Sequence, residues 1–313
     1  MKQLLTSPNE ELFTARIFAE LGEKIDITAI EPVNKGWSND KKYLIRTSKG
    51  EKLLIRISDK NDYEGKKYLF EKLKEVATLG VNTPIPMDAG LCNSAKSAYI
   101  LLSWVEGEDA KSVLPQLKRA QQYSLGVKTG VLVQKLHNLP APKDAEAMGV
   151  RYRREMQKKI NYYNNNPVKS PEGDTLVRYL LDNQELLDSR PNTFMHGDCN
   201  ITNIIVTPDS EIGLIDFWCD YGDPWWEFDP ASWGEEPIAP FITGIYNGYF
   251  NGKPPATFFK MQSFYLAFNA LEALCAYLSE GDDVGKNHAV NVMRWFDDMR
   301  NPIPSWYNRG FST

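Results

Sequence analysis

Two short motifs constrain this 313-residue chain more than any other part of its sequence. His196–Asn203 reads H-G-D-x-x-x-x-N, and Ile215–Phe217 reads I-D-F after a β-branched run and a turn of Pro, Asp and Ser. Turns of that composition join antiparallel strands. The pattern therefore predicts a strand that ends near His196, a tight loop over residues 197–202, and a hairpin that begins at Asn203. The returning strand of this hairpin would bring Asp216 beside Asn203.

The polar side chains of these motifs fit the needs of phosphoryl transfer. In that reaction the protein forms few covalent bonds, so positioning and charge neutralisation dominate. Asp198 is placed to orient an acceptor hydroxyl and to take its proton. Asn203 and Asp216 supply the oxygen ligands that Mg²⁺ prefers. Each residue alone would suit an ordinary turn or hairpin, but the order and spacing of all three favour a catalytic centre.

Composition restricts the partners of the chain. A net charge of −5 argues against nucleic acid and suits a cationic small molecule. Four cysteines without zinc-type spacing, and only three histidines, predict free thiols in a reducing cytoplasm and no zinc site. The longest apolar stretch, residues 264–278, is interrupted by polar residues and is too short to span a membrane. The N-terminus lacks an apolar secretory core, so we expect a cytoplasmic protein without membrane contact. The sequence sets no oligomeric state.

Strand patterns dominate the first third of the chain and helix patterns the remainder. Helices are expected over residues 9–22 and 63–79, and strands over 25–33, 42–46, 52–57 and 99–105, with a proline-marked loop before the last strand. After residue 106 the pattern becomes mostly helical, interrupted by the motif hairpins. The segment 161–174, rich in Asn and Pro, is interpreted as a loop.

The two motifs resemble the signature of the aminoglycoside phosphotransferase and choline kinase-like family, and the resemblance extends from about residue 33 to about residue 307. It implies an α+β, two-lobed, protein-kinase-like fold. Residues 1–105 would form a small antiparallel-sheet N-lobe that binds nucleotide, and residues 106–313 a mostly helical C-lobe for catalysis and substrate binding. Gly197 follows the motif histidine where protein kinases have Arg, which favours a small-molecule kinase.

The resemblance also implies two backbone-based contacts with the nucleotide. Gly36 and Ser38 would lie in a flap over the phosphates, because glycine permits close backbone approach and a serine hydroxyl with neighbouring N–H groups suits an anion. Ser103 and Val105, at the end of an apolar strand, would present main-chain groups to the adenine or guanine edge.

A cation in the third strand should contact the phosphates. Arg56 stands where the kinase pattern most often has Lys; a guanidinium can hold phosphate, although Arg and Lys are not interchangeable. Lys52 is the alternative cation. The carboxylate that pairs with this cation from the following helix would be Glu71, with Glu64 as the alternative.

Carboxylates after the second motif are candidates for acceptor binding. Asp220 and Glu227 would face the substrate, with the pair Glu235-Glu236 adding negative charge, whereas Asp223 would cap a helix and brace the catalytic loop.

The resulting prediction is a Mg²⁺-dependent kinase that moves the γ-phosphoryl group of ATP or GTP to a hydroxyl of a cationic small molecule. An aminoglycoside-like antibiotic is the leading acceptor, with antibiotic resistance as the implied role. Choline, a macrolide or a hydroxylated amino acid are alternative acceptors. A nucleotide-binding pseudokinase is the alternative from another class: Arg56 favours it, and retention of all three motif residues opposes it. A protein kinase is disfavoured because no A-P-E-like segment follows Asp216.

Overall fold

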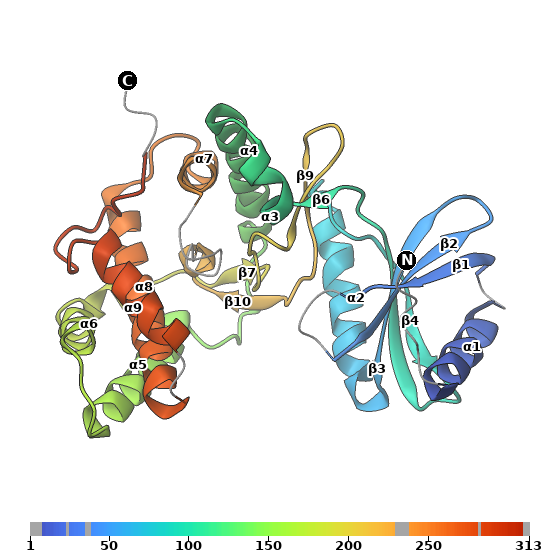
Figure 1. The fold of residues 1–313 in the computed structure, drawn as a ribbon, viewed down its shortest axis with the longest axis horizontal. Coiled ribbons are helices and arrows are strands. Elements are labelled where there is room, and N and C mark those ends of the chain that lie inside the picture. Colours follow the sequence, from blue (N-terminus) through green and yellow to red (C-terminus); the bar gives the residue numbers. More distant parts are fainter. Residues whose placement is uncertain (1–7, 23–24, 35–38, 229–237, 281–282, 309–313) are drawn as a thin grey trace. The chain divides into compact units, whose positions relative to one another are not determined.

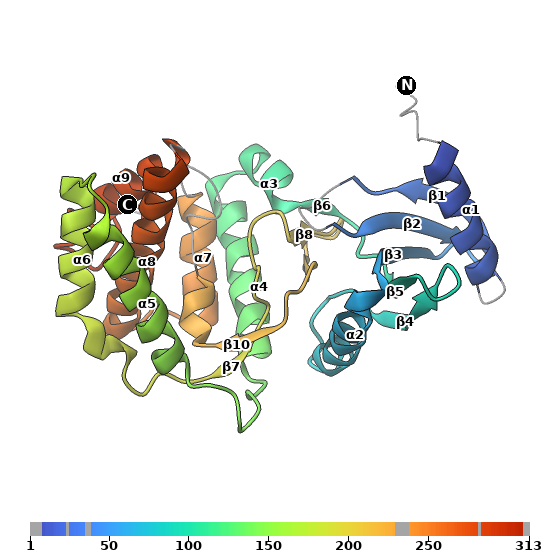
Figure 2. The same cartoon turned by 90° about the horizontal axis from the view of Figure 1, so that it is seen from below.

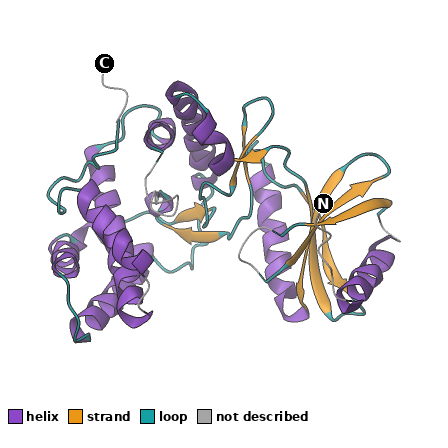
Figure 3. Cartoon of the chain, viewed as in Figure 1, coloured by secondary structure: helices purple, strands orange, loops and turns teal. Residues whose placement is uncertain are grey.

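The chain forms two compact units, residues 1–106 and 107–313 (Figure 1). The computed structural model describes residues 8–22, 25–34, 39–228, 238–280 and 283–308. The first unit is built on an antiparallel sheet and the second is mostly helical (Figure 3). The predicted α+β class, with a sheet region followed by a helical region, is confirmed. The division falls one residue after the predicted boundary at 105.

The first unit contains a five-stranded sheet in the order β1-β2-β3-β5-β4, with every neighbouring pair antiparallel. Its elements are α1 (Pro8–Gly22), β1 (Ile27–Pro32), β2 (Lys41–Thr47), β3 (Lys52–Asp59), the 3₁₀ turn η1 (Lys60–Asp62), α2 (Tyr63–Ala77), β4 (Pro86–Cys92) and β5 (Ser97–Ser103). The predicted strands and helices of this region all occur, with ends shifted by a few residues.

The two faces of this sheet are covered by different helices. Successive strand residues point to opposite faces, and on one face the odd-numbered apolar residues of the central strands pack with α1, including Ile45, Ile55, Ile57 and Leu101. Helix α2 packs against β4 and β5 and lies on the other side of the sheet from α1 in both views (Figure 2). Even-numbered side chains such as Arg56 therefore project towards α2.

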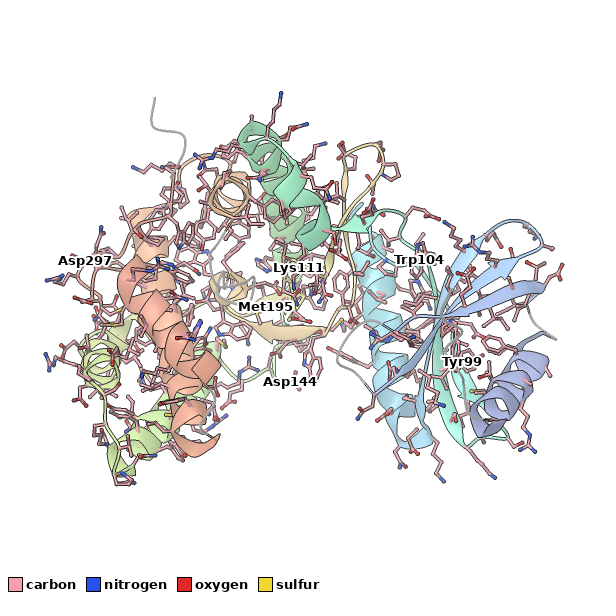
Figure 4. The ribbon with its side chains drawn as sticks, viewed as in Figure 1. Tyr99, Trp104, Lys111, Asp144, Met195 and Asp297 are labelled. Carbon is pink, nitrogen blue, oxygen red and sulfur yellow. The ribbon has the colours of Figure 1, made fainter. Side chains whose placement is uncertain are left out.

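Strand β4 was not predicted, because Pro84 and Pro86 were interpreted as marking a loop. Proline lacks the N–H that an inner strand must donate, but an edge strand tolerates it. β4 is the edge of the sheet and begins at Pro86, with a register shift between Pro86 and Asp88. Its partner β5 carries the buried Tyr99 (Figure 4), whose hydroxyl donates to Asp88 at 2.6 Å.

The second unit is mostly helical and contains a two-stranded and a three-stranded sheet. Its elements are β6 (Glu108–Asp109), α3 (Ala110–Val113), η2 (Leu114–Gln116), α4 (Arg119–His137), α5 (Met148–Asn165), α6 (Pro171–Asp182), η3 (Gln184–Leu187), β7 (Thr193–Met195), β8 (Ile204–Val206), β9 (Ile212–Leu214), β10 (Asp220–Gly222), η4 (Pro224–Glu227), α7 (Ala239–Tyr249), α8 (Ala256–Glu280) and α9 (Asp283–Trp295). Segment 161–174 is not one loop: α5 continues to Asn165, and Ser170 caps α6 with Pro171 in its first turn.

Helices α4 and α7 approach closely because glycines line their contact. A Cβ on Gly126 would lie 2.0 Å from the Phe241 carbonyl oxygen, and a Cβ on Gly244 would lie 2.3 Å from the Tyr123 carbonyl oxygen. Any larger residue at either position would separate the helices. This contact fixes the C-terminal ends of both helices, which carry His137 and Tyr249.

Two strand pairs carry the sequence motifs. β8 and β9 form the predicted hairpin, with Ile204 opposite Leu214. β7 pairs instead with β10, a strand that was not predicted, so that Met195 lies opposite Asp220. The H-G-D loop thus leaves one pair and enters the other.

In the part of the chain that the structure describes, no helix combines the length and the apolar character needed to cross a membrane.

Candidate active site

The H-G-D loop connects β7 to β8 and presents Asp198 to solvent. Met195, the last residue of β7, is fully buried and fixes the start of the loop (Figure 4). The Asp198 carboxylate is exposed, and its two oxygens accept from Asn200 Nδ2 and from Asn203 Nδ2, each at 2.8 Å. Two amide donors therefore hold the carboxylate in one orientation while leaving it accessible.

Asn203 and Asp216 lie side by side at the open end of the β8–β9 hairpin. The Ile215 N–H donates to the Asn203 carbonyl at 2.9 Å, which extends the ladder by one pair and places Asp216 next to it. Asp216 is half-buried with φ of 61°, a left-handed conformation that turns the chain directly after the strand. The hairpin predicted from the sequence brings these two residues together.

His196 joins the two motifs from the inside. It is fully buried, its Nδ1 accepts from the Asp198 N–H at 3.2 Å, and its Nε2 donates to the Ile215 carbonyl at 2.9 Å. Its ring lies against Phe217 with centroids 4.1 Å apart. Burial holds the pKa of His196 below its ordinary value, so the ring is neutral and carries its proton on Nε2.

Glu227 clamps the backbone of the H-G-D loop and does not face a substrate, contrary to the sequence-based expectation. Its side chain is 2% exposed. It accepts from the His196 N–H at 3.0 Å, from the Gly197 N–H at 2.6 Å and from His137 Nε2 at 2.8 Å. His137 Nδ1 in turn lies 3.0 Å from the Tyr249 hydroxyl.

Burial alone would raise the pKa of Glu227, but the His137 contact and the backbone donors keep it below its ordinary value. An ionised carboxylate with three donors is therefore the stable state of this buried group.

A second buried carboxylate braces the segment that leads to Glu227. Asp223 accepts from the Trp225 N–H at 2.9 Å at the start of η4, as the capping prediction required. It is fully buried, forms a bidentate pair with Arg190 and accepts from the Tyr265 hydroxyl at 2.6 Å.

The thiol inside the loop takes no evident part in chemistry. All four cysteines are free and buried. Burial raises the pKa of the Cys199 thiol well above its ordinary value, which keeps it protonated and unreactive.

The donor set of Asn203 and Asp216 fits Mg²⁺. Asn203 Nδ2 donates to both the Asp198 carbonyl and its carboxylate, so the amide oxygen is directed away from Asp198. One amide oxygen and one carboxylate are hard ligands of the kind that Mg²⁺ takes together with substrate phosphates. Among the described residues no cluster of three or more His, Cys, Asp or Glu could hold a metal.

The acidic side chains that were expected to face the acceptor are paired, buried or outside the described residues. Asp220 pairs with Arg151, whose Nη2 lies 3.2 Å from the carboxylate, with both side chains about a third exposed. Glu227 is buried, and Glu235-Glu236 lie outside the described residues. Of the negative groups near the motifs, the exposed Asp198 and the half-buried Asp216 remain.

In the first unit, Arg56 is held by Asp40 and not by Glu71. Arg56 Nε lies 2.7 Å from Asp40 Oδ2, and Lys66 Nζ of α2 lies 2.5 Å from the same oxygen. All three side chains are about nine-tenths buried. Glu71 is exposed and pairs with Lys74 at 3.3 Å. The helix thus supplies a cation where the sequence suggested a carboxylate.

Glu64 and Lys52 were the alternatives to Glu71 and Arg56. Glu64 is exposed in the first turn of α2, and Lys52 pairs with Glu106 at 2.6 Å.

Ser103 and Val105 were expected to present main-chain groups to the nucleotide base, and they differ in the hydrogen bonding of their N–H groups. The Ser103 N–H donates to the Ile85 carbonyl at 2.8 Å, so the sheet edge already uses it. Val105 is half-buried, and no group in the described residues accepts from its N–H. Gly36 and Ser38 lie outside the described residues.

Sequence reasoning missed two residues that hold candidate site residues in place. His137 contacts Glu227 in the second unit, and Asp40 contacts Arg56 in the first. His137 ends a helix and Asp40 precedes a strand, and neither belongs to a motif that would indicate its partner. The long-range contacts of Glu227 with His137 and of Asp40 with Lys66 arise only when distant elements pack together.

The chain belongs to the phosphotransferase enzyme family, whose sequence model matches residues 29–259. No curated protein shows significant sequence similarity to it.

Several solved structures share its fold. One is the gentamicin complex of APH(2")-IIa, with 14% identity, coverage of 90% of this chain and 96% of that chain, and a TM-score of 0.60. A second is the GDP complex of aminoglycoside 2'-phosphotransferase-IIIa, at 15% identity, 90% and 99% coverage and a TM-score of 0.62. A third is choline kinase LicA from Streptococcus pneumoniae, at 15% identity, 90% and 98% coverage and a TM-score of 0.55.

Proposed function

We propose that this phosphotransferase moves the γ-phosphoryl group of a nucleoside triphosphate to a hydroxyl of a cationic small molecule. The observation that carries the proposal is the convergence of Asp198, Asn203 and Asp216 at one end of the β8–β9 hairpin. A solvent-exposed carboxylate stands there beside two oxygen ligands suited to a metal–nucleotide complex. A structural role would not require an accessible Asp198 held by two amide donors.

Asp198 would act as the base. Its carboxylate accepts the hydroxyl proton of the acceptor, while Asn200 and Asn203 keep it oriented through their amide donors. His196 and Glu227 do not contact the reacting atoms; they hold the loop backbone so that Asp198 stays in place. Asn203 and Asp216 would hold Mg²⁺, which when bound neutralises charge on the transferred phosphoryl group.

The phosphoryl donor would be ATP or GTP. The GDP complex of the 2'-phosphotransferase supports a nucleotide donor for this fold, and Arg56 is the candidate cation for the phosphates in the first unit. Asp40, and not a carboxylate of helix α2, would be the partner that holds the Arg56 guanidinium in place.

The acceptor is proposed to be an aminoglycoside-like molecule, with choline as the alternative. Two of the structures that share the fold are a gentamicin complex and a choline kinase, and both compounds are cations that carry a hydroxyl. The net charge of −5 and the exposed carboxylate of Asp198 favour such a cation.

A nucleotide-consumption screen with a matched pair of variants tests the proposal. Wild-type protein is offered gentamicin, a macrolide, choline and hydroxylated amino acids with ATP or GTP, and phosphorylated product is identified by mass. Asp198→Asn should lower kcat by about 10²–10⁴-fold and leave nucleotide affinity unchanged. Asp209→Asn, in the exposed β8–β9 turn, is the control and should match wild type. Transfer that survives in Asp198→Asn at more than about a tenth of wild-type kcat would refute the assigned base.

A further inference from the structure

Trp218 is an exposed tryptophan directly after the I-D-F motif. Its surface is 78% exposed, whereas the other tryptophans in the described part of the chain are half-buried or buried. Tryptophan side chains are highly buried on average. The exposure of Trp218 is therefore unusual.

The backbone holds Trp218 in this outward position. Asp216 and Cys219, on either side of the Phe217-Trp218 pair, are both left-handed, with φ of 61° and 60°. Such conformations are uncommon for residues other than glycine and cluster at functional sites. The Trp218 N–H also donates to the His196 carbonyl at 2.9 Å. The turn therefore directs Phe217 inward against the His196 ring and leaves the Trp218 indole outside.

Trp218 also packs against the backbone of the H-G-D loop. A Cβ placed on Gly197 would lie 2.9 Å from the Trp218 Cβ, so the tryptophan stands beside the residue that precedes Asp198. Its surroundings are polar and negative: Asp198 is exposed and Asp216 is half-buried. An apolar, electron-rich face is thus fixed next to two carboxylates.

We propose that Trp218 is the platform on which the amino-sugar acceptor proposed above stacks. This inference rests on the proposed function and specifies its acceptor site. The indole face attracts ammonium groups and packs with the apolar face of a sugar ring. A ring stacked on Trp218 would have its hydroxyls near Asp198, because Trp218 packs against Gly197, the residue directly before Asp198.

Calorimetric titration of gentamicin without nucleotide tests this site independently of transfer. Trp218→Ala should weaken gentamicin binding by about 2–30-fold, and Trp218→Phe should retain most of the affinity because it keeps an aromatic face. Tyr162→Ala removes an exposed aromatic ring from α5 and should bind as wild type does. The melting temperature of Trp218→Ala should stay near that of wild type, since the side chain is exposed.

Binding of gentamicin to Trp218→Ala within twofold of wild type, or no binding of gentamicin to the wild-type protein, would overturn the inference. The proposed function would survive either result if another acceptor were phosphorylated in the screen with Asp198 as base. In a kinetic assay the supporting pattern is a raised KM for gentamicin with little change in kcat or in nucleotide KM.

Discussion

Replacing Glu227 with Gln should destabilise the second unit strongly although the side chain keeps its shape. The carboxylate receives three donors: the N–H groups of His196 and Gly197 and His137 Nε2. A glutamine oxygen can replace only one carboxylate oxygen. If it keeps the two donors on Oε2, its NH₂ group faces the Gly197 N–H and leaves that donor without an acceptor.

The magnitude follows from these contacts. A hydrogen bond to a charged group is worth about 1.5–3 kcal/mol, and an unsatisfied donor costs about 1–3 kcal/mol. Removal of the buried charge relieves part of its desolvation cost, so the net loss should be about 3 kcal/mol. For a unit of this size that corresponds to about 6–12 °C in melting temperature.

Urea denaturation followed by circular dichroism measures the difference, with Glu211→Gln as the matched control. Glu211 pairs with Lys128 on the surface and is 57% exposed, so its replacement should cost at most about 1 kcal/mol. If the free energies of unfolding of Glu227→Gln and Glu211→Gln differed by less than about 1 kcal/mol, the contacts of Glu227 with the loop backbone would not stabilise the protein as we argue.

Three further outcomes are expected. Asn203→Ala and Asp216→Ala should each raise the Mg²⁺ concentration needed for half-maximal nucleotide binding by about tenfold, as expected for loss of about 1.4 kcal/mol, whereas Asp209→Ala should not; unchanged Mg²⁺ titrations in both would remove the metal assignment. Stability should fall as the pH drops below about 6.5, because burial lowers the pKa of folded His196 and the unfolded chain binds its proton first, giving a slope of up to about 1.4 kcal/mol per pH unit. His196→Asn should remove this slope, and an equal slope in both proteins would contradict the neutral buried ring. The KM for gentamicin should rise between about 0.05 and 0.5 M KCl while the nucleotide KM changes less; a salt-independent acceptor KM would argue against a cationic acceptor.

Local patterns in the sequence were sufficient for the β8–β9 hairpin and for the meeting of Asn203 with Asp216. Both depend on short-range features: alternating apolar strands, a turn of Pro, Asp and Ser, and a fixed spacing between the motifs. The order of sheet and helices was predictable for the same reason. Strand β4 escaped prediction because its prolines favour a loop locally, and only its place at the sheet edge makes them acceptable.

The partners of buried charges were decided by tertiary structure. The sequence predicts that Glu227 faces a substrate, yet it accepts from His137, which lies 90 residues away in the sequence. Arg56 likewise pairs with Asp40 and shares it with Lys66 of α2, not with Glu71. A carboxylate looks the same in sequence whether it meets solvent, a metal or a backbone N–H. Which of these it meets is set when packing excludes water, since a buried charge is stable only where donors surround it.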